Sequence, residues 1–120
     1  NEALLSRFVV IKLPLISLPN LEKLLQTEFP ALQLRALPQF CALFFDLQKK
    51  AQQAEISSKA IDLRGLLAAI RLMQQGLDAR TALRLGITNK VLDDYESALV
   101  EDCIAMRIPE NLAADRLFRD

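Results

Sequence analysis

The chain has 120 residues, of which 52% are apolar, and its 15 basic and 15 acidic side chains give a formal net charge of zero. This composition fits one domain with its own core and excludes a disordered tail, and the balanced charge argues against nucleic acid as a partner. No apolar run approaches the roughly 18 residues that span a bilayer, and the first residues do not combine a charged start with an apolar core, so we expect no membrane partner and a cytoplasmic setting.

The types of reactive residue limit the chemistry further. The sequence contains no histidine and two cysteines, Cys41 and Cys103. Without histidine, the usual Ser/His and Cys/His catalytic arrangements and the common zinc sites have no counterpart here. We interpret both cysteines as buried apolar residues, and we expect no metal site and no catalysis by this segment alone.

The first residues predict the end of a helix followed by a strand. Residues 2–7 resemble the last turns of a helix, and the β-branched run 8–13 before Pro14 is typical of a short buried strand. Because a lone strand cannot satisfy its own backbone groups, we expect its neighbours outside this chain. Together with the start without methionine, this indicates a piece of a longer protein. The remainder is helical, so we predict an all-α helical bundle with one orphan strand.

Two helices are predicted next. Ser17 or Asn20 can cap a short amphipathic helix that Pro30 closes. The second helix covers about residues 36–55, and its first half is apolar on several sides. Its second half, from Gln48, is polar and is therefore expected to extend into solvent.

Clear capping signals mark the next two helices. Asp62 is placed to cap a helix that ends at Gly76, a residue suited to a left-handed conformation. Asp78 is placed to cap a short helix over residues 79–85. Gly65 lies inside a helical turn, where glycine costs up to about 1 kcal/mol relative to alanine. Close approach of a neighbouring group would explain it.

The last long helix is expected to begin at a Thr88 cap and to end before Pro109. Its apolar stripe is predicted to face the core. The stripe consists of Leu92, Tyr95, Leu99, Cys103 and Met106. Residues 110–120 are predicted to form either a final short helix or a mobile tail.

Three segments resemble a known family. Residues 1–8, Asn-Glu-Ala-Leu-Leu-Ser-Arg-Phe, followed by an apolar strand and Leu13-Pro14, resemble the part of MoxR-type AAA+ ATPases that leads from the arginine-finger helix into the last core strand. The run 57–67 resembles the sensor 2 helix of the family's helical lid, and 76–108 is similar to the helices that complete that lid. The resemblance covers residues 1 to about 108.

The resemblance implies a division of the chain and a place in a larger machine. It assigns residues 1–15 to the end of the ATPase core, 16–108 to the helical lid and 109–120 to a C-terminal tail. For the full-length parent it implies ATP and magnesium as cofactors and a hexameric ring of identical subunits. It further implies a chaperone-like remodeller with a von Willebrand A-type partner protein.

The same resemblance implies roles for two arginines. Arg7 falls at the arginine-finger position, where a catalytic guanidinium reaches the nucleotide of the neighbouring subunit. Arg64 falls at the sensor 2 position, where it binds the nucleotide of its own subunit, in a first helical turn that already favours an anion. A planar, permanently protonated guanidinium suits the charge that spreads over a phosphate during transfer.

The family pattern is incomplete in this chain. The sequence contains no glycine-rich loop of the G-x-x-x-x-G-K-[S/T] type and no apolar strand ending in paired acids after such a loop. These parts cradle the phosphates and hold magnesium. The parent is therefore expected to be an ATPase, whereas this segment alone is not.

Two other functions fit parts of the pattern. Residues 79–99 match a helix-turn-helix with Gly86 in the turn and Leu92 and Tyr95 packing back. The second helix is acidic, so its carboxylates would face DNA phosphates, which disfavours DNA binding. The other alternative is a helical protein-interaction module that uses this acidic face and the apolar tail residues. The acids are Asp93, Asp94, Glu96, Glu101 and Asp102, and the tail residues are Leu112, Leu117 and Phe118.

Overall fold

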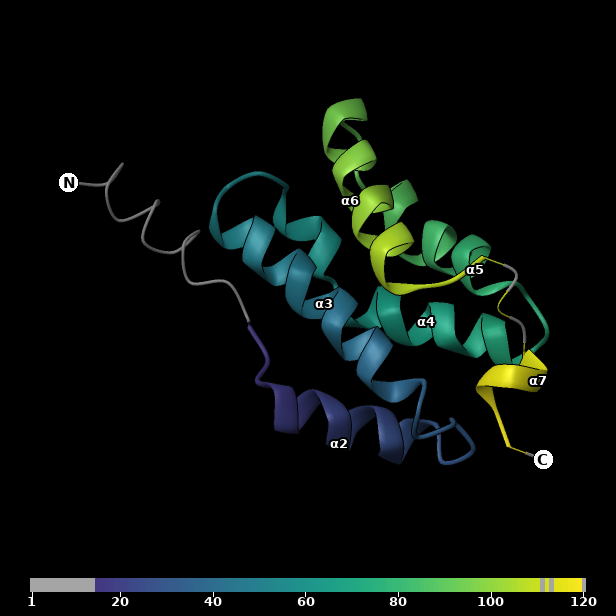
Figure 1. Cartoon of the computed structure of the whole chain (residues 1–120). Helices are drawn as coiled ribbons and strands as arrows, with labels where there is room; N and C mark the ends of the chain where they lie inside the picture. The colour runs from purple at the N-terminus through teal and green to yellow at the C-terminus, as the bar shows by residue number, and fades with distance from the viewer. Residues whose placement is uncertain (1–14, 111, 113, 120) are drawn as a thin grey trace.

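The computed structural model is a bundle of helices and describes residues 15–110, 112 and 114–119 (Figure 1). In this part of the chain no sheet is present, and the sole β-type pairing is an isolated antiparallel bridge between Leu32 and Phe118. The predicted all-α helical bundle is confirmed. The elements are α2 Leu18–Glu28, α3 Leu37–Gln52, η1 Ser58–Ile61, α4 Leu63–Gln74, α5 Ala79–Gly86, η2 Thr88–Lys90, α6 Asp94–Arg107 and α7 Ala114–Leu117.

The expectations for the first residues lie outside the described part of the chain. They comprise the helix end over 2–7, the orphan strand over 8–13 and the arginine-finger residue Arg7.

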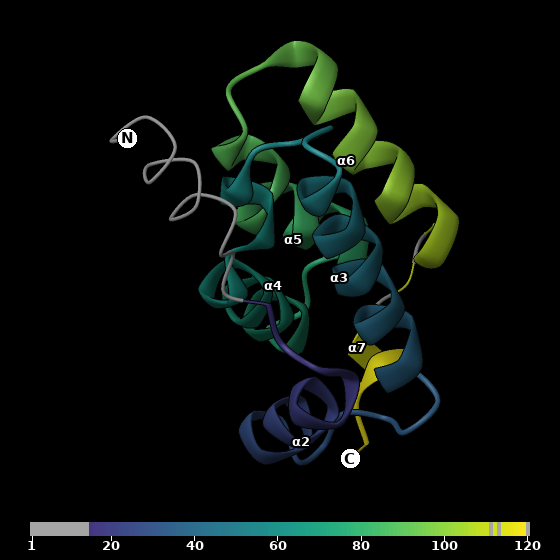
Figure 2. The same cartoon turned by 90° about the vertical axis from the view of Figure 1, so that its left-hand side faces the viewer.

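Helix α3 organises the bundle. It packs against α2, η1 and α6, while α4 pairs with α5 (Figures 1 and 2). Several of its apolar side chains, among them Phe40 and Phe44, are almost fully buried, as are Leu66 and Ile70 of α4. Burial of this apolar surface is the main source of stability, because each fully buried large side chain contributes about 1.5–3 kcal/mol.

Most predicted helix ends are confirmed. The Ser17, Asp62 and Asp78 side chains accept hydrogen bonds from backbone N–H groups in the first turns of α2, α4 and α5. Gly76 follows α4 with φ of +112°, the conformation that glycine adopts without strain.

The predicted start of the last long helix is wrong. Residues Thr88–Lys90 form the separate turn η2, and α6 begins at Asp94. Its cap is Asp93, whose carboxylate accepts a 2.9 Å hydrogen bond from the Glu96 backbone N–H. An aspartate followed three residues later by a glutamate, with further acid in the first turn, is a stronger start signal than Thr88.

The predicted inward stripe of this helix is confirmed at Cys103 and in part at Leu99, which is partly buried against the core, and is wrong at its other three residues. Leu92, Tyr95 and Met106 are 82%, 73% and 78% exposed. The buried side of α6 consists instead of Val100, Cys103 and Ile104, followed by Ile108. Since successive residues of a helix are rotated by about 100°, two overlapping stripes one residue apart both fit the helical period, and periodicity does not choose between them.

The tail forms the short helix α7, one of the two predicted alternatives. Leu117 is fully buried and Phe118 is 9% exposed. The Gln33 N–H donates a 2.7 Å hydrogen bond to the Leu117 carbonyl, and the Arg119 N–H donates to the Ala31 carbonyl at 2.6 Å. Helix α7 is therefore attached to the connection between α2 and α3.

The polar half of α3 does not simply extend into solvent as predicted. Gln48 is 6% exposed. Its Oε1 accepts a 2.9 Å hydrogen bond from the Ile16 N–H, and its Nε2 donates to the Ile16 carbonyl at 3.3 Å. One side-chain amide thus pairs with both the N–H and the carbonyl of Ile16, the two groups that a neighbouring β-strand would otherwise bind. The segment before α2 is thereby tied to α3.

We predict that Gln48→Ala lowers the free energy of unfolding by about 1–3 kcal/mol, because it removes both bonds to Ile16. Exchange of the Ile16 amide hydrogen, followed by NMR, should accelerate more than that of amides inside α3. Gln48→Glu is the matched control: it keeps the acceptor for the Ile16 N–H but loses the donor, so its effect on exchange should be intermediate. Unchanged exchange at Ile16 in Gln48→Ala would contradict this assignment.

Candidate functional site

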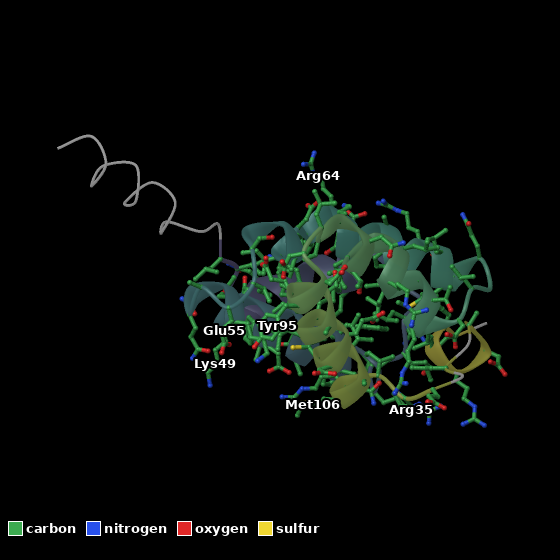
Figure 3. All side chains as sticks on the ribbon, turned by 90° about the horizontal axis from the view of Figure 1, so that it is seen from above. Arg35, Lys49, Glu55, Arg64, Tyr95 and Met106 are labelled. Carbon is green, nitrogen blue, oxygen red and sulfur yellow. The ribbon has the colours of Figure 1, made fainter. Side chains whose placement is uncertain are left out.

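The N-terminal turn of α4 presents an exposed arginine. Arg64 is the second residue of this helix, and its side chain is 93% exposed and points away from the bundle (Figure 3). Its Nε lies 3.7 Å from Oδ1 of Asp62. At that distance, and with this exposure, the attraction is weak. The Arg64 guanidinium therefore keeps most of its donors available.

Asp62 is held mainly by other groups. Its Oδ1 accepts a 3.0 Å hydrogen bond from the Arg64 backbone N–H, and its Oδ2 accepts one from Lys90 Nζ, also at 3.0 Å. The hydrogen bond from Lys90 is the main reason that the pKa of the Asp62 carboxyl is lowered. Because the carboxylate is engaged by the cap and by Lys90, it competes little for the Arg64 side chain.

Beneath this turn, α4 and α5 meet backbone to backbone. A Cβ placed on Gly65 would lie 2.4 Å from the Gly86 carbonyl oxygen, and one on Gly86 would lie 2.5 Å from the Gly65 carbonyl oxygen. The expectation that close approach explains Gly65 is therefore confirmed. Because the contact involves main-chain atoms of both helices, it fixes the position of the first turn of α4, and hence the base of the Arg64 side chain.

This arrangement suits an anion. The start of the 12-residue helix α4 carries partial positive charge, and Arg64 adds a planar group with several N–H donors. A phosphate or carboxylate brought to this face would meet the guanidinium, while the Arg64 backbone N–H already donates to Asp62. The base of the side chain is fixed while the guanidinium is free to reach outward.

The cysteines are not part of any reactive site. Cys41 and Cys103 are both free and buried, as expected from the sequence. Burial raises the pKa of the Cys41 thiol to about 11 and raises that of Cys103 as well, so both stay protonated near neutral pH and react poorly. Within the described residues, no group of three or more potential ligand side chains is placed to hold a metal ion.

Sequence reasoning missed two residues of this site. Lys90 is 28 positions from Asp62, and no local pattern connects them. Gly86 is the last residue of α5, close to the predicted end of that helix, but its role as the counterpart of Gly65 has no local signal. A glycine inside each of two neighbouring helices is a signal for such a contact, but it does not identify the pair.

Comparisons with known proteins give one relative and no family. No protein-family model matches the chain, and no solved structure matches it. The chain is similar to the "Uncharacterized protein YojN" of Bacillus subtilis (strain 168), with 31% identity over 102 residues. The match covers 85% of this chain and 33% of that protein, so the chain spans about a third of the length of this relative. Among the described residues, no helix has the length and apolar character needed to cross a membrane.

We predict that Gly65→Ala destabilises the protein, although alanine is intrinsically favoured in a helix by up to about 1 kcal/mol. The new methyl group would overlap the Gly86 carbonyl and push α4 away from α5, at a cost of about 1–3 kcal/mol in urea unfolding. Ala68→Ser, on the exposed side of α4, is the control and should change stability by no more than about 0.5 kcal/mol. A more stable Gly65→Ala protein would show that the helices do not touch here.

Proposed function

We propose that this chain is the helical lid segment of a MoxR-like AAA+ ATPase, with Arg64 as the sensor 2 residue and Arg7 as the arginine finger. The full-length protein binds ATP and magnesium and acts in the cytoplasm as a ring-shaped, chaperone-like remodeller. The observation that carries this proposal is the Arg64 guanidinium, which is 93% exposed above a turn fixed by main-chain contact.

A sensor arginine has three physical requirements that this turn meets. Its base must be fixed, and the contact between Gly65 and Gly86 supplies that. Its guanidinium must not be neutralised by a nearby acid, and Asp62 is engaged by Lys90 at 3.0 Å. Its surroundings must favour a phosphate, which the start of a helix does. These three properties together support the role of Arg64 better than exposure alone.

In the proposed mechanism the remainder of the longer protein binds the nucleotide, and this bundle closes over it. Arg64 then donates hydrogen bonds to a phosphate, so that loss of the terminal phosphate weakens closure and the lid moves. The Gln48 amide bonds to Ile16 tie the entering segment to α3, so movement of that segment is passed to the bundle. In the ring, proposed to be a hexamer, Arg7 meets the terminal phosphate of the neighbouring subunit, and a von Willebrand A-type protein is the proposed partner.

The observed burial of side chains argues against the two alternative functions, a DNA-binding helix-turn-helix and a protein-interaction module. A helix-turn-helix needs Leu92 and Tyr95 packed against the preceding helix, yet these side chains are 82% and 73% exposed. The interaction module was expected to use Leu117 and Phe118 for docking, but these residues lie in the core of this bundle. The exposed face of α6 is the part of that alternative that remains.

We predict different kinetic effects for the two arginines in the full-length protein. Arg7→Ala should reduce ATP turnover by about 10³-fold or more without changing ATP affinity, because a finger stabilises the transferring phosphoryl group from the next subunit. Arg64→Ala should reduce turnover and also weaken nucleotide binding, because this residue contacts the nucleotide of its own subunit. Steady-state ATPase rates and a fluorescent-nucleotide titration measure both quantities.

Arg71→Ala is the matched control. Arg71 lies two turns after Arg64 on the exposed side of α4 and pairs with Glu28 at 3.4 Å. Its loss should leave turnover and affinity unchanged. If Arg64→Ala behaves like Arg71→Ala, the sensor role of Arg64 is wrong, and unchanged turnover in Arg7→Ala would contradict the finger role.

A further inference from the structure

A cleft of about 240 Å³ opens between the start of α3 and the segment that leads into α7. Two arginines from distant parts of the sequence line it, Arg35 just before α3 and Arg116 within α7, together with the amide side chain of Gln39. The cleft is smaller than the roughly 300–1,000 Å³ of pockets that hold drug-sized molecules. Its size therefore suits a small ligand.

The positive charge of this cleft is not balanced by the described residues. Neither Arg35 nor Arg116 forms an ion pair with an acid among them, and no acidic side chain lines the cleft. Of the acids nearest in the sequence, Glu110 pairs with Arg80 at 3.3 Å, and Asp115 does not line the cleft. Two guanidinium groups in one cleft repel each other, and a bound anion removes that repulsion.

The start of α3 adds to this positive field. No acid lies in its first turn and no side chain caps it, whereas aspartate side chains cap α4 and α6. The partial positive charge at the start of this 16-residue helix is therefore uncompensated. The first backbone N–H groups are not available to a ligand, because Pro38 has none and those of Leu37 and Gln39 already donate to carbonyls. Hydrogen bonds to an anion must come from the side chains.

Charge and donor geometry favour a phosphate over a carboxylate. A phosphate monoester carries a charge of about −1.5 to −2 near neutral pH and has three acceptor oxygens, so it can balance both guanidinium groups and accept hydrogen bonds from each. A carboxylate brings a single charge and two oxygens. The cleft also offers apolar surface, since Pro109 is exposed and Leu112 is half-buried. An organic group attached to the phosphate would have this surface to contact.

We propose that this cleft binds a small phosphate monoester. The phosphate lies between Arg35 and Arg116 and accepts hydrogen bonds from both and from the Gln39 amide. The organic part of the ligand packs on Pro109 and Leu112. A phosphorylated side chain of another protein carries the same chemical group and is the rival source of it.

This site is separate from the proposed nucleotide site. Figure 3 shows Arg35 and Arg64 on opposite sides of the bundle. The inference therefore goes beyond the proposed nucleotide role and does not rest on it.

The test is an NMR titration of the ¹⁵N-labelled 120-residue chain with phenyl phosphate, at low ionic strength so that charges are little screened. The signals to follow are the Nε–H groups of Arg35 and Arg116 and the side-chain amide of Gln39. We expect these signals to shift together, with a Kd on the order of 1 mM. Benzoate has the same ring with a carboxylate, and inorganic phosphate has no ring. Both should bind at least about fivefold more weakly.

Two variants test the arginines separately. Arg35→Gln and Arg116→Gln each remove one positive charge, and each should weaken phenyl phosphate binding by about tenfold. Both side chains are exposed, so the core should be undisturbed, and unchanged amide signals outside the cleft verify this. Lys23→Gln is the charge-matched control. Lys23 is exposed and does not line the cleft, so its loss should leave the Kd within about twofold.

The inference is overturned if phenyl phosphate shifts none of the three side-chain signals up to about 10 mM, or if shifts are confined to the start of α4. It is equally overturned if benzoate binds as tightly as phenyl phosphate, or if either arginine variant binds as tightly as Lys23→Gln.

A capped five-residue peptide, with a central phosphotyrosine among alanines, distinguishes the two sources of the phosphate. It should bind no tighter than phenyl phosphate, because the small cleft accepts only the phosphorylated ring. A peptide that binds about tenfold more tightly, or better, would contradict the small-molecule ligand.

Discussion

The approach of two glycines is the constraint on which the rest of the site depends. Gly65 and Gly86 bring the main chains of α4 and α5 into direct contact. With the helices this close, Lys90 beyond the end of α5 reaches Asp62 before the start of α4. The carboxylate is then shared between a helix cap and a lysine, and the neighbouring Arg64 side chain is left to extend into solvent. A larger residue at either glycine would separate these elements.

The polar contacts of the molecule divide by burial into two kinds. The ion pairs of Asp62 with Lys90 and of Arg71 with Glu28 are partly or largely exposed, and such pairs contribute at most about 1 kcal/mol each. These ion pairs orient their side chains more than they stabilise the fold. The bonds of Gln48 to the Ile16 backbone are different, because the side chain is almost fully buried and its loss leaves polar groups without partners. Stability comes mainly from the apolar core around α3.

The sequence predicted the local features well and the long-range ones poorly. The all-α class, the caps at Ser17, Asp62 and Asp78, the left-handed Gly76 and the close approach at Gly65 all follow from short patterns, and the structure confirms them. The predicted start of α6 was wrong, and its predicted buried side was right only at Cys103 and in part at Leu99. Two adjacent stripes have the same helical period, and only packing against α3 selects one. The burial of Gln48 and the pairing of Lys90 with Asp62 depend on residues 32 and 28 positions apart. No local sequence pattern predicts these two long-range contacts.

The most direct measurement is a cryo-EM structure of the full-length assembly with a non-hydrolysable ATP analogue. Our account predicts that a nitrogen of the Arg64 guanidinium lies within about 4 Å of a phosphate oxygen of the nucleotide in the same subunit, the range of an ion pair. It also predicts that Gly65 and Gly86 keep their main-chain contact in that closed state. An Arg64 side chain that points into bulk water, far from every bound nucleotide, would contradict the account.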